Sequence, residues 1–72
     1  MMRRYLVVVE QADGNLSAYS PDVPGCVATG RDLAEVRARM AEAIRFHIDG
    51  LREDGLPIPE PHARAEYVPV EA

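Results

Sequence analysis

The sequence contains one cysteine and two histidines, which can act as a nucleophile and as bases: Cys26, His47 and His62. A thiol becomes an effective nucleophile when a base lies within hydrogen-bonding reach or a helix N-terminus lowers its pKa. Cys26 follows a Pro-Gly pair at the start of a short apolar run, and His47 falls on the apolar side of a predicted helix. A free cysteine is commonly buried as a small hydrophobic residue. We therefore expect Cys26 and His47 to be core residues, and we assign no role to His62.

Metal-assisted hydrolysis needs several carboxylates that converge from different elements. The early candidates, Glu10, Asp13 and Asp22, all lie at predicted strand ends or turns, where acids favour turn formation. The histidines and the cysteine lack the paired spacing of a zinc site, and the glycines form no phosphate-binding motif. We expect no catalytic residue, no metal and no cofactor. A residual hydrolase or nuclease, using Cys26 with His47 or Glu10 and Asp22 with a metal, is an alternative.

The elements that position these residues follow an α+β order, β-β-β-α-β, in one domain spanning residues 1–72. An apolar run predicts a first strand at 3–10, and an Asp-Gly-Asn turn leads to a second strand at 16–20. The loop Pro21-Asp22-Val23-Pro24-Gly25 then separates a third strand at 26–30, because prolines fix φ and lack a backbone donor. Weak alternation predicts a fourth strand at 64–70, at a sheet edge because of Pro69.

One amphipathic helix is the clearest element. Asp32 is a good N-cap with Glu35 three residues later, and Gly55 is a natural residue to follow the helix end. Apolar residues recur at three- and four-residue steps and predict a single buried stripe: Leu33, Val36, Met40, Ile44, His47, Ile48 and Leu51. We expect this helix to pack on one face of an antiparallel sheet.

The first strand is apolar at every position from Tyr5 to Val9, so both of its faces need a cover. One helix covers only one face, and a chain of 72 residues has a marginal core of its own. A single cysteine excludes an intramolecular disulfide. Small domains without disulfides or metals often gain stability by association. We therefore expect a homo-oligomer, either a dimer or a tetramer.

The formal net charge is −4. Nucleic-acid binders usually carry a basic patch, and the only adjacent basic pair here is Arg3-Arg4. The acidic balance favours a basic partner instead. The short apolar run near the N-terminus is too short for a signal peptide or a membrane span. We expect no membrane association and a cytoplasmic protein, as a lone cysteine also suggests.

The segment from Ala18 to Gly30, AYSPDVPGCVATG, resembles the central signature of HicB-like antitoxins. The likeness continues through the end of the helix, AIRFHIDGL, and the tail DGLPIPEP, in the family's order. The resemblance implies a bacterial or archaeal protein with a partial, degenerate RNase H fold that has lost nuclease activity. It also implies a partner, a small basic HicA-like toxin that cleaves mRNA and whose active site the antitoxin hides.

Many members of this family carry a further DNA-binding domain after the antitoxin domain. This sequence stops after the predicted fourth strand, so we expect no direct DNA binding. The alternative function is an orphan, oligomeric protein-binding module without a toxin partner.

The family's toxin contacts are not tied to a short motif, so the contact residues are predicted on physical grounds. Phe46 projects away from the apolar helix stripe, and aromatic residues are enriched in interfaces. We predict a partner-binding surface formed by this side chain and nearby acids: Asp22, Glu35, Glu42, Phe46 and Asp49.

Overall fold

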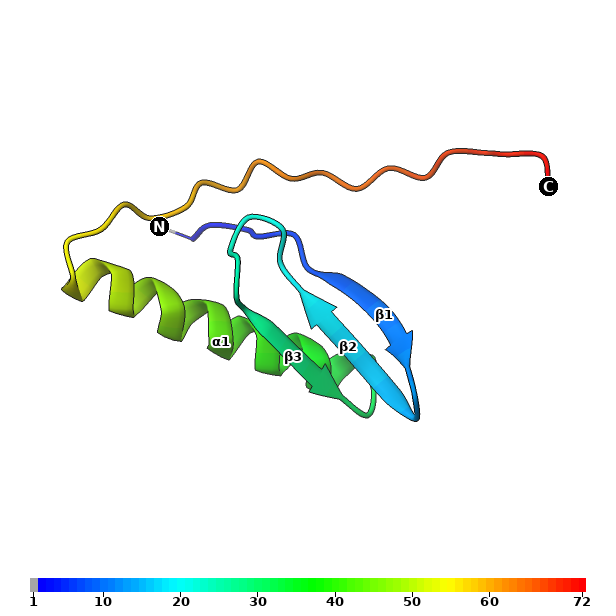
Figure 1. The fold of residues 1–72 in the computed structure, drawn as a ribbon, viewed down its shortest axis with the longest axis horizontal. Helices are drawn as coiled ribbons and strands as arrows, with labels where there is room; N and C mark the ends of the chain where they lie inside the picture. Colours follow the sequence, from blue (N-terminus) through cyan, green and yellow to red (C-terminus); the bar gives the residue numbers. More distant parts are fainter. Residues whose placement is uncertain (1) are drawn as a thin grey trace.

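A computed structural model describes residues 2–72 and confirms the α+β architecture (Figure 1). Three strands, β1 (Val8–Ala12), β2 (Asn15–Tyr19) and β3 (Val27–Gly30), form an antiparallel sheet in the order β1-β2-β3. One helix, α1 (Leu33–Glu53), follows and packs against β3 and β2. The helix does not reach β1, which is the strand of the sheet farthest from it.

The turn between β1 and β2 consists of Asp13 and Gly14, with Ala12 opposite Asn15. Gly14 has a φ of 74°, which a glycine adopts without strain. The first strand was predicted at 3–10, but the ladder begins at Val8. The reason is the length of β2: Tyr19 pairs with Val8, and the chain then leaves the sheet towards Pro21, which has no N–H to donate.

The loop between β2 and β3 is ordered by its own hydrogen bonds. The Val23 N–H donates to the Ser20 carbonyl at 3.2 Å, and the Cys26 N–H donates to the Val23 carbonyl at 3.2 Å. The buried Ser20 hydroxyl donates to the Leu6 carbonyl at 2.9 Å, so the loop is also tied to the segment before β1. Val23 itself is fully buried, which makes the centre of this loop part of the core.

Both ends of α1 are capped as the sequence predicts. The Asp32 carboxylate accepts a hydrogen bond from the Glu35 N–H at 2.8 Å. At the other end, the Leu56 N–H donates to the Leu51 carbonyl and the Gly55 N–H to the Arg52 carbonyl. With Gly55 at a φ of 67°, these bonds form a Schellman motif that ends the helix.

The core lies between α1 and the sheet side that faces it. Its buried members come from the helix stripe, β2 and the loop before β3: Ala18, Val23, Cys26, Val36, Met40 and Ile44. Gly30 lets the end of β3 approach the first turn of the helix, because a Cβ there would lie 2.8 Å from the Val36 nitrogen. Cys26 is one of the buried core residues, so the buried position predicted for it is confirmed.

The fourth strand predicted at 64–70 is absent from the sheet. The described chain after Gly55 is extended but pairs with no strand, and residues 64–72 are exposed (Figure 1). A strand needs a partner with free backbone groups. Residues 59–63 are held beside residues 3–5 and Asp22, and the chain after them lies along no strand of this sheet. The prediction identified an extended conformation but was wrong about its pairing within the chain.

Candidate protein interface

Phe46 and two acids form one exposed stripe along α1. Glu42, Phe46 and Asp49 follow each other at four- and three-residue steps, so their side chains share a helix face. Phe46 is 82% exposed, which confirms that it lies off the core stripe. A large exposed aromatic side chain flanked by carboxylates offers an apolar anchor with charged groups at its rim, an arrangement that occurs in protein interfaces.

The charges of α1 form two adjacent rows. Glu35, Glu42 and Asp49 recur at seven-residue intervals, and Arg45 and Arg52 recur at the same interval in the neighbouring row, where Arg52 lies 3.9 Å from Asp49. The helix as a whole holds as many arginines as acids. The negative net charge of the chain therefore comes from the strands, turns and C-terminal segment. This arginine row was not predicted, although its seven-residue spacing is visible in the sequence.

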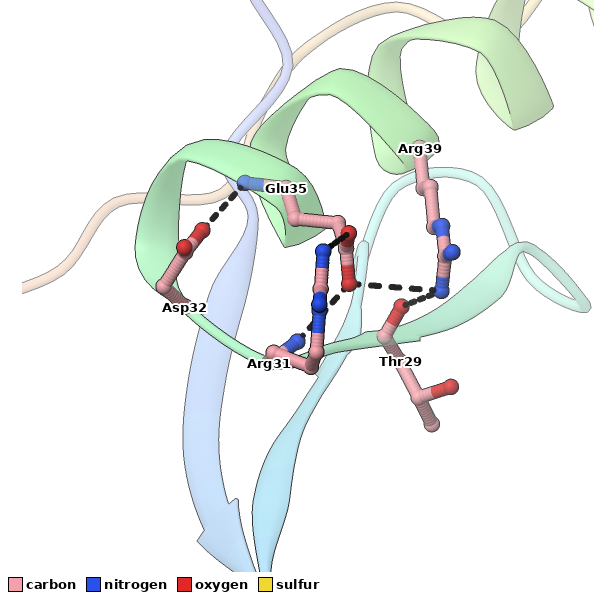
Figure 2. Close-up of polar contacts among 5 residues, drawn as sticks. All are labelled: Thr29, Arg31, Asp32, Glu35 and Arg39. Carbon is pink, nitrogen blue, oxygen red and sulfur yellow. Dashed lines mark hydrogen bonds and ion pairs between the residues drawn. The ribbon is translucent and has the colours of Figure 1, made fainter.

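Glu35 belongs to a polar network at the start of α1 (Figure 2). Its carboxylate accepts from the Arg31 N–H at 2.9 Å and from the Arg31 guanidinium at 3.2 Å. Arg39 lies 3.7 Å from the same carboxylate and also donates to the Thr29 carbonyl at 2.9 Å. The hydrogen bonds from Arg31, the backbone one first, lower the pKa of Glu35 below its ordinary value of 4.5. Glu35 is thus engaged in fixing the helix start against β3.

The Asp22 carboxylate connects its loop to the C-terminal segment through hydrogen bonds. One oxygen of its carboxylate accepts from the His62 N–H at 3.0 Å and from the Ala63 N–H at 2.8 Å. The segment just before is held by the Tyr5 hydroxyl, which donates to the Pro59 carbonyl at 2.7 Å. These contacts join positions about forty or more residues apart in sequence, so no local pattern could have revealed them.

A shallow groove runs along α1, between the helix and the segment that precedes β1. Its apolar lining includes Tyr5, Val7, Ile44, Phe46 and Ile48. Arg45, Arg52, Glu42 and Asp49 border it. The stripe that contains Phe46 therefore forms one rim of a longer apolar surface.

The residues considered for catalysis are either buried, exposed singly, or engaged in holding the backbone. The Cys26 thiol donates to the Ala43 carbonyl at 3.7 Å, and burial raises its pKa. Both effects favour the uncharged thiol over the nucleophilic thiolate. Cys26 and the half-buried His47 line a second, small recess. Glu10 is exposed on β1, whereas Asp22 holds backbone N–H groups.

Two further properties bear on function. Within residues 2–72, no group of three or more metal-ligating side chains is arranged to hold a metal ion. The single helix of the described chain, α1, is not both long and apolar enough to cross a membrane.

Comparison with known proteins shows to which family this chain is related. Residues 5–71 match the family described as HicB_like antitoxin of bacterial toxin-antitoxin system. An uncharacterised 14.9 kDa protein from the rep-hol intergenic region of Haemophilus phage HP1 is 34% identical over 64 residues. That alignment covers 89% of this chain but only 48% of the phage protein.

A UPF0150 protein of Thermoplasma acidophilum is 29% identical over 62 residues, which cover 86% of this chain and 90% of the archaeal protein. The family match covers nearly the whole chain and includes the loop at Asp22, the helix with Phe46 and the anchored C-terminal segment. The resemblance seen in the sequence is thereby confirmed: the chain belongs to the HicB-like antitoxin family.

Proposed function

We propose that this domain binds and neutralises a small, basic, HicA-like mRNA-cleaving toxin by protein–protein contact in the cytoplasm. The observation that carries the proposal is the family match over residues 5–71. The net charge of −4 supports a basic partner, because complementary charge speeds encounter and disfavours acidic competitors. The role is one of binding, with no reaction catalysed by this chain.

The surface proposed for the toxin is the exposed stripe of α1. Phe46 supplies the apolar anchor, and Glu42 and Asp49 supply carboxylates for arginine or lysine side chains of the partner. Asp49 lies 3.9 Å from Arg52, and both side chains are well exposed, so this ion pair costs little to exchange for another. Glu35 and Asp22 contribute less directly, because their carboxylates already hold groups of this chain.

The test is affinity purification of the tagged domain from its native cells, followed by RNA cleavage assays on any small basic protein that is recovered with it. Wild-type protein should suppress cleavage at equimolar concentration. Phe46→Ala should weaken toxin binding by about 30-fold, as expected for an interface anchor worth roughly 2 kcal/mol. Leu33→Ala, an exposed apolar truncation at the other end of the same helix and outside the groove, serves as the matched control and should leave the affinity within about threefold.

Two results would contradict this proposal. One is a neighbouring basic ribonuclease whose cleavage is unaffected by the domain. The other is a complex that Phe46→Ala and Leu33→Ala weaken equally.

An orphan protein-binding module without a toxin is the second candidate. The exposed apolar side chains of the C-terminal segment favour it, since Tyr67, Val68 and Val70 lie far outside the core. Recovery of the domain from its native cells with one unrelated partner would support this alternative. Recovery with a small basic ribonuclease would exclude it.

A further inference from the structure

The groove along α1 is positively charged, in contrast to the chain as a whole. Its lining includes four arginines but only two acids: Arg3, Arg37, Arg45 and Arg52, with Glu42 and Asp49. The whole chain has a formal net charge of −4. The local charge of a surface selects and orients the partner that docks on it. An occupant of this groove should therefore be acidic, unlike the basic partner proposed for the stripe of Phe46.

The arginines of α1 that line the groove are available to a partner. Arg37 and Arg45 are exposed and take part in none of the ion pairs of residues 2–72. Arg52 lies 3.9 Å from the exposed Asp49, a pair that a partner's carboxylate can replace at little cost. Arg3, by contrast, is held by the C-terminal segment. The three helix arginines are separated by about 12 Å and about 10 Å along the helix axis.

The face of α1 in the groove has the pattern of a helix that packs against another helix. Five of its lining residues follow each other at alternating three- and four-residue steps: Ala38, Ala41, Arg45, Ile48 and Arg52. Residues at these steps form a narrow stripe, the seam along which two helices pack at a small crossing angle. Ile48 is half-buried and the other four residues are exposed, so this stripe is distinct from the buried one that faces the sheet.

The opposite side of the groove supplies further apolar surface. Tyr5 and Val7 come from the segment before β1, which runs beside α1, and Ile58 comes from the segment after the helix (Figure 1). All three side chains are half-buried and so still offer surface to a ligand. Covering apolar surface is favourable. An apolar lane between two walls fits the mode of recognition in which the apolar face of an amphipathic helix enters a groove.

We propose that this groove binds an acidic amphipathic helix of another protein. The apolar face of that helix lies against Ala41, Ile48 and Val7, and its carboxylates meet Arg45 and Arg52. Two helices that lie side by side have the same rise per residue, so acids seven residues apart in the partner stay in register with these two arginines. The proposal goes beyond toxin neutralisation and does not depend on it.

The two acids of the groove favour a helix over a nucleic acid. Glu42 and Asp49 line the same surface as the arginines and would repel a continuous row of phosphates. A helix carries its charges at chosen positions. It can place acids opposite the arginines and neutral or basic residues opposite Glu42 and Asp49.

The test is a fluorescence anisotropy titration of the full chain with a labelled, helix-forming peptide of roughly three heptads. Leucines at three- and four-residue steps form its apolar face, and glutamates recur at seven-residue intervals along the flanks. The matched probe carries lysine at every glutamate position. We expect the glutamate peptide to bind at least about tenfold more tightly than the lysine peptide, with an affinity that falls as salt is added.

Two pairs of variants locate the binding site. Arg45→Glu and Arg64→Glu change the net charge equally, but Arg64 is exposed in the C-terminal segment and lies outside the groove. Arg45→Glu should weaken binding of the glutamate peptide by at least about tenfold, and Arg64→Glu by less than about threefold. Ala41→Gln fills the stripe and should weaken binding at least about fivefold, whereas Ala34→Gln, also exposed on α1 but outside the groove, should not.

Several outcomes would overturn the proposal. A glutamate peptide that does not bind at millimolar concentration would do so, as would equal binding of the two peptides. Equal effects within either pair of variants would place the site elsewhere. Tighter binding of single-stranded RNA than of the glutamate peptide, lost in Arg45→Glu, would assign the arginines to nucleic acid. A dimer in sedimentation equilibrium that Ala41→Gln dissociates would assign the groove to a second copy of this chain.

Discussion

A pair of glycine substitutions tests the packing of the helix on the sheet. At Gly30, an added Cβ would lie 2.8 Å from the Val36 nitrogen and 3.1 Å from its Cα and Cβ. The nearest atoms belong to backbone, and Val36 is fully buried, so neither partner can turn aside. At Gly50, inside α1, nothing lies within 4 Å of an added Cβ. The same substitution should therefore have opposite signs at the two positions.

The magnitudes follow from these contacts. Overpacking a core contact costs about 1–3 kcal/mol, and the reduced freedom of the unfolded chain returns about 0.4–1 kcal/mol. Gly30→Ala should thus lower the free energy of unfolding by roughly 1–2 kcal/mol, which corresponds to a Tm lower by about 5–15 °C in a domain of this size. Gly50→Ala should raise the free energy of unfolding by about 0.5–1 kcal/mol through helix propensity.

The assay is thermal and urea unfolding, monitored by far-UV circular dichroism at one fixed protein concentration. A third variant, Gly14→Ala, separates the two physical causes. An added Cβ at Gly14 meets no atom within 4 Å, but the residue has a φ of 74°. The loss of about 1 kcal/mol in the free energy of unfolding therefore comes from backbone conformation alone. A Gly30→Ala protein as stable as the wild type would refute the close approach of β3 to α1. A destabilised Gly50→Ala protein would refute the open surroundings of that position.

Three further predictions concern single polar groups. Asp22→Ala should speed hydrogen exchange at the His62 and Ala63 amides by at least about tenfold in NMR spectra, because both donate to that carboxylate; unchanged exchange would exclude the anchor. Because the pKa of Glu35 is lowered below 4.5, its ionised form stabilises the fold above that pH, and this contribution is lost as the pH falls through the lowered value. Glu35→Gln should therefore unfold more easily than the wild type near pH 7, with the difference shrinking below about pH 4.5; a constant difference would contradict the assignment. Burial raises the pKa of the Cys26 thiol, so a colourimetric disulfide reagent should modify it on the order of tenfold more slowly in the native protein than in urea, and equal rates would show an accessible thiol.

Local chemistry made α1 predictable from sequence. Its start is set by Asp32 with Glu35, its end by Gly55, and its buried face by the spacing of apolar residues. The prediction was wrong at Leu33, the first residue of the predicted buried stripe, which is 54% exposed. The capping contact differs in one respect, since the Glu35 side chain accepts from the Arg31 N–H, one residue before the N-cap. The exposure of Phe46 followed from the same helical spacing.

Non-local pairing limited the prediction of the strands. The start of β1 depends on how many residues β2 offers before the chain turns away, which the apolar run from Tyr5 to Val9 does not encode. The fourth strand failed for a related reason, because alternation in residues 64–70 indicates a preference for extended structure but names no partner. Asp22 was placed in the candidate interface by its charge, whereas its contacts with His62 and Ala63 arise only in the folded chain.

The distribution of charge separates two contributions to binding the basic partner proposed above. Since α1 carries balanced charges, the net charge of −4 originates in the turns, the strands and the C-terminal segment. Long-range attraction depends on that net charge and governs the association rate, which salt reduces. The rate of dissociation depends on close contacts, which we propose centre on the exposed Phe46. A change at Phe46 should therefore act on dissociation with little effect on the salt dependence of association, whereas acids outside the helix should act in the opposite way.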